Sequence, residues 1–158
     1  MRWAALSLPI LLLASIPAQA ADDADSAKQG YAVAAVELEA GQAYLRGLQT
    51  LARSDAEWDH EVPAALFGDA QRAIAAATVG VQGLQGLAHE SRFARATEPL
   101  SAAAHQLDNA QSDLRALAAP AHGLAVPASD RVRAVARLQG SLAGAQQALL
   151  QAKPSLAP

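Results

Sequence analysis

The amino-acid sequence predicts an all-α fold, an up-down-up-down antiparallel four-helix bundle that follows an N-terminal signal peptide. Alanine and leucine dominate the chain after residue 20, while aromatic residues make up only 4% of the whole chain. These strong helix formers run in long stretches between a few proline-containing breaks. Within four of the stretches, apolar residues recur at alternating steps of three and four, which is the heptad pattern of left-handed helix packing. Short connections between successive helices favour antiparallel neighbours.

Residues 1–20, MRWAALSLPILLLASIPAQA, have the form of a secretory signal peptide. Arg2 precedes an apolar run, and the segment ends in the small-residue pattern Ala18-Gln19-Ala20, after which cleavage is expected. The apolar run is short for a membrane span, so an anchor is the less favoured alternative. The chain has no cysteine and no N-glycosylation sequon. We therefore expect a periplasmic or secreted bacterial protein with no membrane span after cleavage.

The first helix of the bundle is expected at residues 23–53. Its apolar series is Tyr31, Ala34, Leu38, Gly41, Leu45, Leu48 and Ala52. Asp22, Asp23 and Asp25 at its start and Arg53 at its end would complement the helix dipole.

The second and third helices are expected at residues 63–89 and 91–118. Their apolar series are Phe67, Ala70, Ile74, Ala77, Val81, Leu84, Ala88 and then Phe93, Ala96, Leu100, Ala103, Leu107, Ala110, Leu114, Leu117. The heptad phase breaks between Ala88 and Phe93, which predicts a tight turn. Pro63 suits the first position of the second helix, because its fixed φ is already helical.

Pro99 lies inside the third series and leaves two alternatives. Either the α-helix starts late, with Thr97 as its N-cap, or it begins near Ser91 and kinks at the proline. The kink is favoured, because Phe93 and Ala96 already keep phase with Leu100.

The fourth helix is expected at residues 128–152, followed by a C-terminal tail at residues 154–158. Its apolar series is Val135, Leu138, Leu142, Ala145, Leu149 and Ala152. Asp130 near its start and Lys153 near its end match the polarity of the helix dipole.

The two halves of the bundle resemble each other in sequence. Residues 37–48, ELEAGQAYLRGL, align without gaps on residues 106–117, QLDNAQSDLRAL. The shared leucines follow from the heptad, but Gln42 with Gln111, and Arg46 with Arg115, lie off the core positions. Duplication of a helical hairpin and coincidence in an alanine-rich background both explain this similarity.

The predicted core leaves no room for a large cofactor. Heptad a positions carry mostly large side chains and d positions mostly alanine or glycine, so the helices approach closely and fill the space between them. None of the four histidines falls on an a or d position, which excludes a haem ligand in the core. No nucleophile elbow or glycine-rich phosphate loop occurs, and the net charge of −3 does not suit nucleic acid. We expect no cofactor, no enzymatic activity and no nucleic-acid partner.

The stretch Glu57-Trp58-Asp59-His60 has the E-x-x-H form of helical di-iron proteins. It occurs only once, and continuing the first heptad series puts Asp55 and Asp59 at core positions, so the bundle has ended there. The remaining metal hypothesis is a surface site for a divalent ion formed by Asp55, Glu57, Asp59 and His60.

Three surface features are candidates for partner binding. Trp58 could anchor a partner or pack over the open end of the bundle. Arg131, Arg133 and Arg137 make the fourth helix basic, which suggests either a charge-complementary contact or a solvated face. Four large apolar residues fall at heptad positions that a monomeric bundle exposes, namely Val33, Val36, Val79 and Leu150.

The sequence therefore favours an exported, non-enzymatic helical bundle that acts through its surface, as an adaptor, stress-related or envelope-associated protein. Its partner would be another protein or a second copy. The first alternative is a metal-binding or metal-sensing bundle that uses residues 55–61. The second is a carrier of a small apolar ligand, which needs a groove that the alanine-rich seams tend to close.

Overall fold

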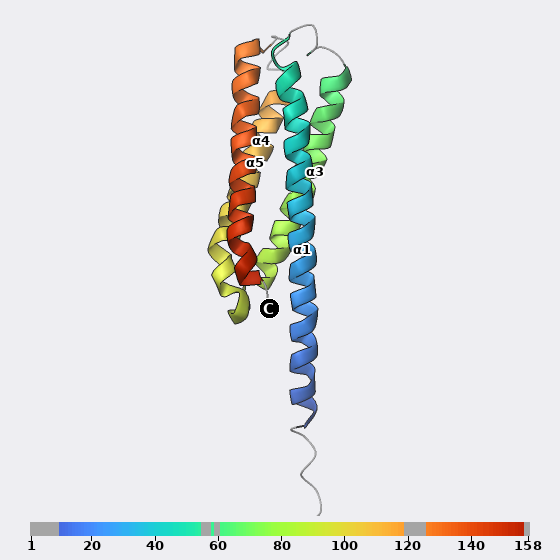
Figure 1. The fold of residues 1–158 in the computed structure, drawn as a ribbon, viewed down its shortest axis with the longest axis vertical. Coiled ribbons are helices and arrows are strands. Elements are labelled where there is room, and N and C mark those ends of the chain that lie inside the picture. The colour runs from blue at the N-terminus through green and yellow to red at the C-terminus, as the bar shows by residue number, and fades with distance from the viewer. Residues whose placement is uncertain (1–9, 55–57, 59–60, 119–125, 157–158) are drawn as a thin grey trace, which may run out of the picture.

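A computed structural model describes residues 10–54, 58, 61–118 and 126–156 of the chain, and within these the side chains from residue 22 onward, except those of residues 61, 62, 91 and 118. Four long α-helices account for most of these residues: α1 (Ile10–Leu51), α3 (Glu61–Leu87), α4 (Thr97–Ala118) and α5 (Ala128–Leu156). A short 3₁₀ helix, η1 (Ser91–Ala96), precedes α4. Figure 1 shows the four helices side by side and alternating in direction. The predicted all-α, four-helix bundle is confirmed.

The helices form a square of two hairpins. α1 packs along α3 in the first hairpin and α4 along α5 in the second, while α1 meets α5 and α3 meets α4 across the two hairpins. Figure 1 also shows the N-terminal part of α1 projecting beyond the bundle. Among the residues that the structure describes, no helix combines the length and apolarity needed to cross a membrane. The signal peptide stays a prediction.

The heptad residues form the core of the bundle. Every residue of the four apolar series is buried except Tyr31 and Phe67, which are half-buried. The series also extend further than predicted, because Ala24 and Ala27 continue the first one backwards and Leu156 continues the fourth one forwards, all of them buried. Burial of Leu156 explains why α5 runs through Pro154 to Leu156 instead of ending at residue 152.

The start of the third helix differs from the favoured prediction. Residues Ser91–Ala96 are helical but form a 3₁₀ turn, and α4 begins only at Thr97, so Pro99 lies in its first turn. An α-helix from Ser91 would need the Pro99 nitrogen to donate to the Arg95 carbonyl, which proline cannot do. In the first turn that donor is not required. The structure thus combines the late α-helical start with helical phase from Ser91.

α1 and α3 touch through their backbones at one point. A Cβ atom built on Gly80 would lie 3.0 Å from the Cβ and 3.1 Å from the nitrogen of Ala34, and 3.2 Å from the Gly30 carbonyl oxygen. No side chain fits between the two helices there, so glycine is required for this approach.

Polar bonds between the hairpins follow the internal sequence repeat. Gln42 Nε2 on α1 donates to Gln146 Oε1 on α5 at 2.8 Å, and Gln111 Nε2 on α4 donates to Thr78 Oγ1 on α3 at 3.0 Å. Gln42 and Gln111 are the two glutamines that the repeat aligns. Their acceptors follow the core residues of α5 and α3 at matching heptad positions. The bundle therefore has approximate twofold symmetry that exchanges its two hairpins.

Candidate functional site

The predicted metal ligands lie in the linker between α1 and α3. Asp55, Glu57, Asp59 and His60 are outside the described residues, so the metal site stays a prediction. In the described parts of the chain, no group of three or more His, Asp or Glu side chains lies close enough to hold a metal ion. His89 and His105 are exposed in the turn and on α4 respectively.

Trp58 lies at the end of the bundle and packs onto it. Its backbone nitrogen donates to the Ser54 carbonyl at 3.1 Å, which holds the residue just beyond α1. The indole ring is half-buried and meets the Phe67 ring edge to face, with centroids 5.4 Å apart and an interplanar angle of 90°. This is a favoured aromatic geometry. The Arg131 guanidinium lies over the indole, 5.1 Å from its centroid. We call Trp58, Phe67 and Arg131 the Trp58 cluster.

Arg131 is a buried part of this cluster, not a surface charge. It is only 2% exposed. Its Nε donates to the Ala52 carbonyl at 3.3 Å and its Nη1 to the Val126 carbonyl at 2.9 Å. The guanidinium therefore joins the end of α1 to the segment that leads into α5, and its charge is offset by carbonyl dipoles and the indole face.

The other two arginines lie on the opposite, solvent-facing side of α5. Arg133 is 71% exposed and pairs with Asp130 one turn earlier, while Arg137 is 65% exposed with its Nε 3.9 Å from Asp113 Oδ1 on α4. Because they are four residues apart, the two share one helix face. The structure brings Arg133 and Arg137 together, separates Arg131 from them, and gives both an acidic neighbour.

The four large apolar residues that the heptad pattern predicts at the surface are exposed in the structure. Val33, Val36, Val79 and Leu150 have 42%, 63%, 67% and 54% of their surface accessible. Val33 and Val79 directly precede Ala34 and Gly80, the residues at which α1 and α3 touch. These two valines therefore lie at the same level of the bundle, one on each helix, next to the crossing point. We call Val33, Val36 and Val79 the α1–α3 apolar surface.

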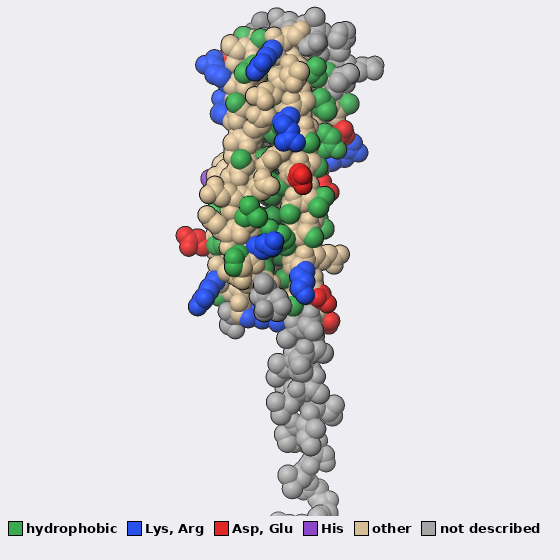
Figure 2. All heavy atoms as spheres, in the orientation of Figure 1, with side chains coloured by type: hydrophobic (Ala, Val, Ile, Leu, Met, Phe, Trp, Pro, Cys, Tyr) green, Lys and Arg blue, Asp and Glu red, His purple; other side chains and the backbone are tan. Residues whose placement is uncertain are grey.

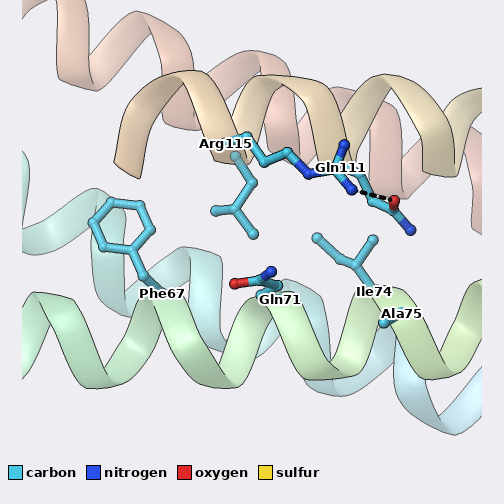
Figure 3. A pocket seen from close by; sticks show the side chains of 7 residues that line it. Phe67, Gln71, Ile74, Ala75, Gln111 and Arg115 are labelled. Carbon is cyan, nitrogen blue, oxygen red and sulfur yellow. Dashed lines mark hydrogen bonds between the residues drawn. The ribbon is translucent and has the colours of Figure 1, made fainter. Parts of the chain in front are cut away.

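A pocket opens between α3 and α4 (Figure 3). Its volume is about 120 Å³, and it is lined by Phe67, Gln71, Ile74, Ala75, Gln111, Leu114 and Arg115. Phe67 belongs to both the pocket and the cluster. Arg115 Nη2 donates to Gln111 Oε1 at 3.4 Å on the α4 side, and Gln71 points from α3 into the space between the helices. Sequence reasoning missed this pocket, because every a position around it carries a large apolar residue.

Charges on the visible face are mixed in sign. Figure 2 shows basic and acidic side chains scattered singly among apolar and neutral polar ones. Such a surface has no extended field of one sign to attract a polyanion. No protein-family model, curated protein or solved structure matches this chain.

Proposed function

We propose that this protein is an exported, non-enzymatic helical bundle that acts by binding another protein molecule through its surface, in an adaptor, stress-related or envelope-associated role. The observation that carries the proposal is the α1–α3 apolar surface. Val36 and Val79 each leave about two thirds of their surface in water, at 63% and 67%.

The filled core supports action at the surface. The large side chains at the centre, among them Leu38, Ile74, Leu107 and Leu142, are at most 1% exposed. A ligand or cofactor bound inside the bundle would have to displace such residues, and each buried aliphatic side chain contributes about 1.5–3 kcal/mol to stability. Binding on the outside costs none of this.

The position of the valines supports a protein as the partner. Val33 and Val79 flank the crossing where the α1 and α3 backbones meet, so a partner would reach them without separating the two helices. Covering the exposed parts of these three valines would contribute about 2.5–5 kcal/mol, at about 1.5–3 kcal/mol for each fully buried side chain. A free energy of this size fits the apolar centre of an interface. The polar residues around the valines would have to supply the rest of the binding free energy.

The test is site-specific photocrosslinking in cells that export the protein. A photoreactive residue at Val36 or Val79 is expected to give a defined covalent adduct, with either a second copy or another protein. The matched controls are the exposed Ser101 and Asp108 on α4, on a different part of the bundle. Adducts of equal yield from all four positions, or none from the two valines, would contradict the proposal.

A further inference from the structure

The pocket between α3 and α4 lies at one of two equivalent interfaces. Because the hairpins are related by approximate twofold symmetry, the α3–α4 interface corresponds to the α1–α5 interface. Pocket residues Gln71, Gln111 and Arg115 correspond to Gln139, Gln42 and Arg46 there. The same side-chain types thus occur at both interfaces, so the α3–α4 interface can be compared with the α1–α5 interface residue by residue.

Two amide pairs close the α1–α5 interface. Gln42 bonds Gln146 at 2.8 Å, and Gln139 Nε2 donates to Gln49 Oε1 at 3.2 Å. At the α3–α4 interface Gln111 still bonds across, to Thr78, but the position that matches Gln49 is Ala118 in the sequence, which has no amide. Within the described residues Gln71 has no hydrogen-bond partner. The second amide pair is missing, and the pocket opens beside it.

The pocket has the volume of a small apolar group. Phe67, Ile74 and Leu114 provide apolar surface in a space of about 120 Å³. For comparison, an engineered apolar cavity of about 150 Å³ binds benzene. A ring or a branched chain of about six carbons therefore matches this space.

The Arg115 guanidinium, a cation, lies at the edge of the pocket. Arg115 donates to the neutral amide of Gln111, and no described carboxylate lies within 4.0 Å of its guanidinium. Guanidinium binds a carboxylate through two parallel hydrogen bonds, which an amide oxygen cannot replace. The Gln71 amide offers a further donor from the opposite helix.

We propose that this pocket binds a small monocarboxylate with an apolar body of about six carbons. The body lies against Phe67, Ile74 and Leu114, and the carboxylate accepts hydrogen bonds from Arg115 and Gln71. This site is separate from the α1–α3 apolar surface, and neither depends on the other.

Phenylacetate is the probe, titrated into the exported protein at low ionic strength and followed by amide chemical shifts. The expected result is saturable shifts at the lining residues. Replacing the carboxylate with an alcohol, in 2-phenylethanol, or removing the ring, in acetate, should weaken binding at least about tenfold, since a charge-assisted hydrogen bond and the apolar body each contribute that much. Equal binding of 2-phenylethanol, or no saturation by phenylacetate, would overturn the assignment.

Two pairs of variants locate the site. Arg115→Gln should weaken phenylacetate about tenfold, while Arg46→Gln, its counterpart at the closed interface, should leave the affinity unchanged. Ala75→Leu should fill the pocket and abolish binding, while Ala143→Leu at the equivalent exposed position of α5 should not. Arginine and glutamine have similar helix propensities, as do alanine and leucine, and all four positions are exposed, so all four variants should fold. An equal effect from both members of either pair would refute the proposed site.

Discussion

Arg131 shows how a charged residue becomes part of a core. Continuing the fourth apolar series backwards from Val135 gives Arg131 a d position, and its 2% exposure agrees with that position. A guanidinium can occupy it because Ala52 and Val126 offer carbonyl oxygens and Trp58 a ring face. The heptad position of Arg131 indicates burial, whereas its residue type, which it shares with Arg133 and Arg137, indicates a surface charge. The carbonyls that make burial possible are fixed only by the tertiary fold.

Arg131→Ala is expected to lower the free energy of unfolding by about 2–3 kcal/mol, because it opens a cavity and leaves two carbonyls without this donor. Arg133→Ala, which removes an exposed charge from the same helix, should change it by less than about 0.5 kcal/mol. Urea denaturation followed by circular dichroism measures both. Similar values for the two variants would show that the hydrogen bonds of Arg131 do not stabilise this end of the bundle.

At the scale of helices, the heptad pattern predicted the number, order and buried faces of the elements, since each depends on local periodicity that side-chain burial enforces. It did not predict how the third helix begins. That depends on Pro99, whose missing N–H is tolerated only in a first turn, and on a 3₁₀ segment that keeps the same residues facing inward. Nor did it predict the pocket, which lies beside the unmatched amide of Gln71 at an interface that only the tertiary fold forms.

Pro99→Ala tests where α4 begins. With Pro99 in the first turn, the substitution should lower the free energy of unfolding by no more than about 1 kcal/mol, through the unfolded chain alone. Ala102→Pro, at an exposed interior position of α4, should cost about 3 kcal/mol or more. Thermal unfolding of both variants is the measurement. A large gain in stability for Pro99→Ala would mean that the proline interrupts an α-helix that starts at Ser91.

Glycines of α3 should respond to alanine in opposite directions. Gly80→Ala is expected to destabilise the bundle by about 1–3 kcal/mol, because the new methyl group overlaps the α1 backbone. Gly83→Ala, where nothing lies within 4 Å, should stabilise it by about 0.4–1 kcal/mol through helix propensity. The same denaturation experiment serves for the two variants, and a shared sign would contradict the close approach of α1 and α3.

The whole molecule consists of two hairpins joined along two interfaces that an approximate twofold symmetry relates. This symmetry gives the aligned glutamines Gln42 and Gln111 a common role, since each donates to the second helix of the other hairpin. Duplication of a helical hairpin and coincidence both remain explanations of the sequence similarity. The two interfaces differ in one respect, because amide pairs join α1 to α5 while a pocket lies between α3 and α4.

Double-mutant cycles should show that Gln42 and Gln111 each stabilise one interface between the hairpins. The Gln42–Gln146 and Gln111–Thr78 pairs are each expected to show a coupling free energy of about 0.5–1 kcal/mol on replacement by alanine. A cycle between Gln42 and Thr78, which belong to different interfaces, serves as the control and should give a value near zero. Coupling in only one of the two pairs would mean that the interfaces are not equivalent.

Gly80 also determines how α3 is aligned along α1, which an alanine- and leucine-rich heptad repeat does not fix by itself. Sliding α3 by one heptad along α1 keeps every apolar residue on the buried seam, so hydrophobic burial alone hardly distinguishes the two alignments. Such a slide would bring Ala73 or Leu87 to the place of Gly80, and either would carry a Cβ atom into the backbone of α1. One residue without a side chain thus selects a single alignment of the two helices, and with it a single level at which Val33 and Val79 face the solvent.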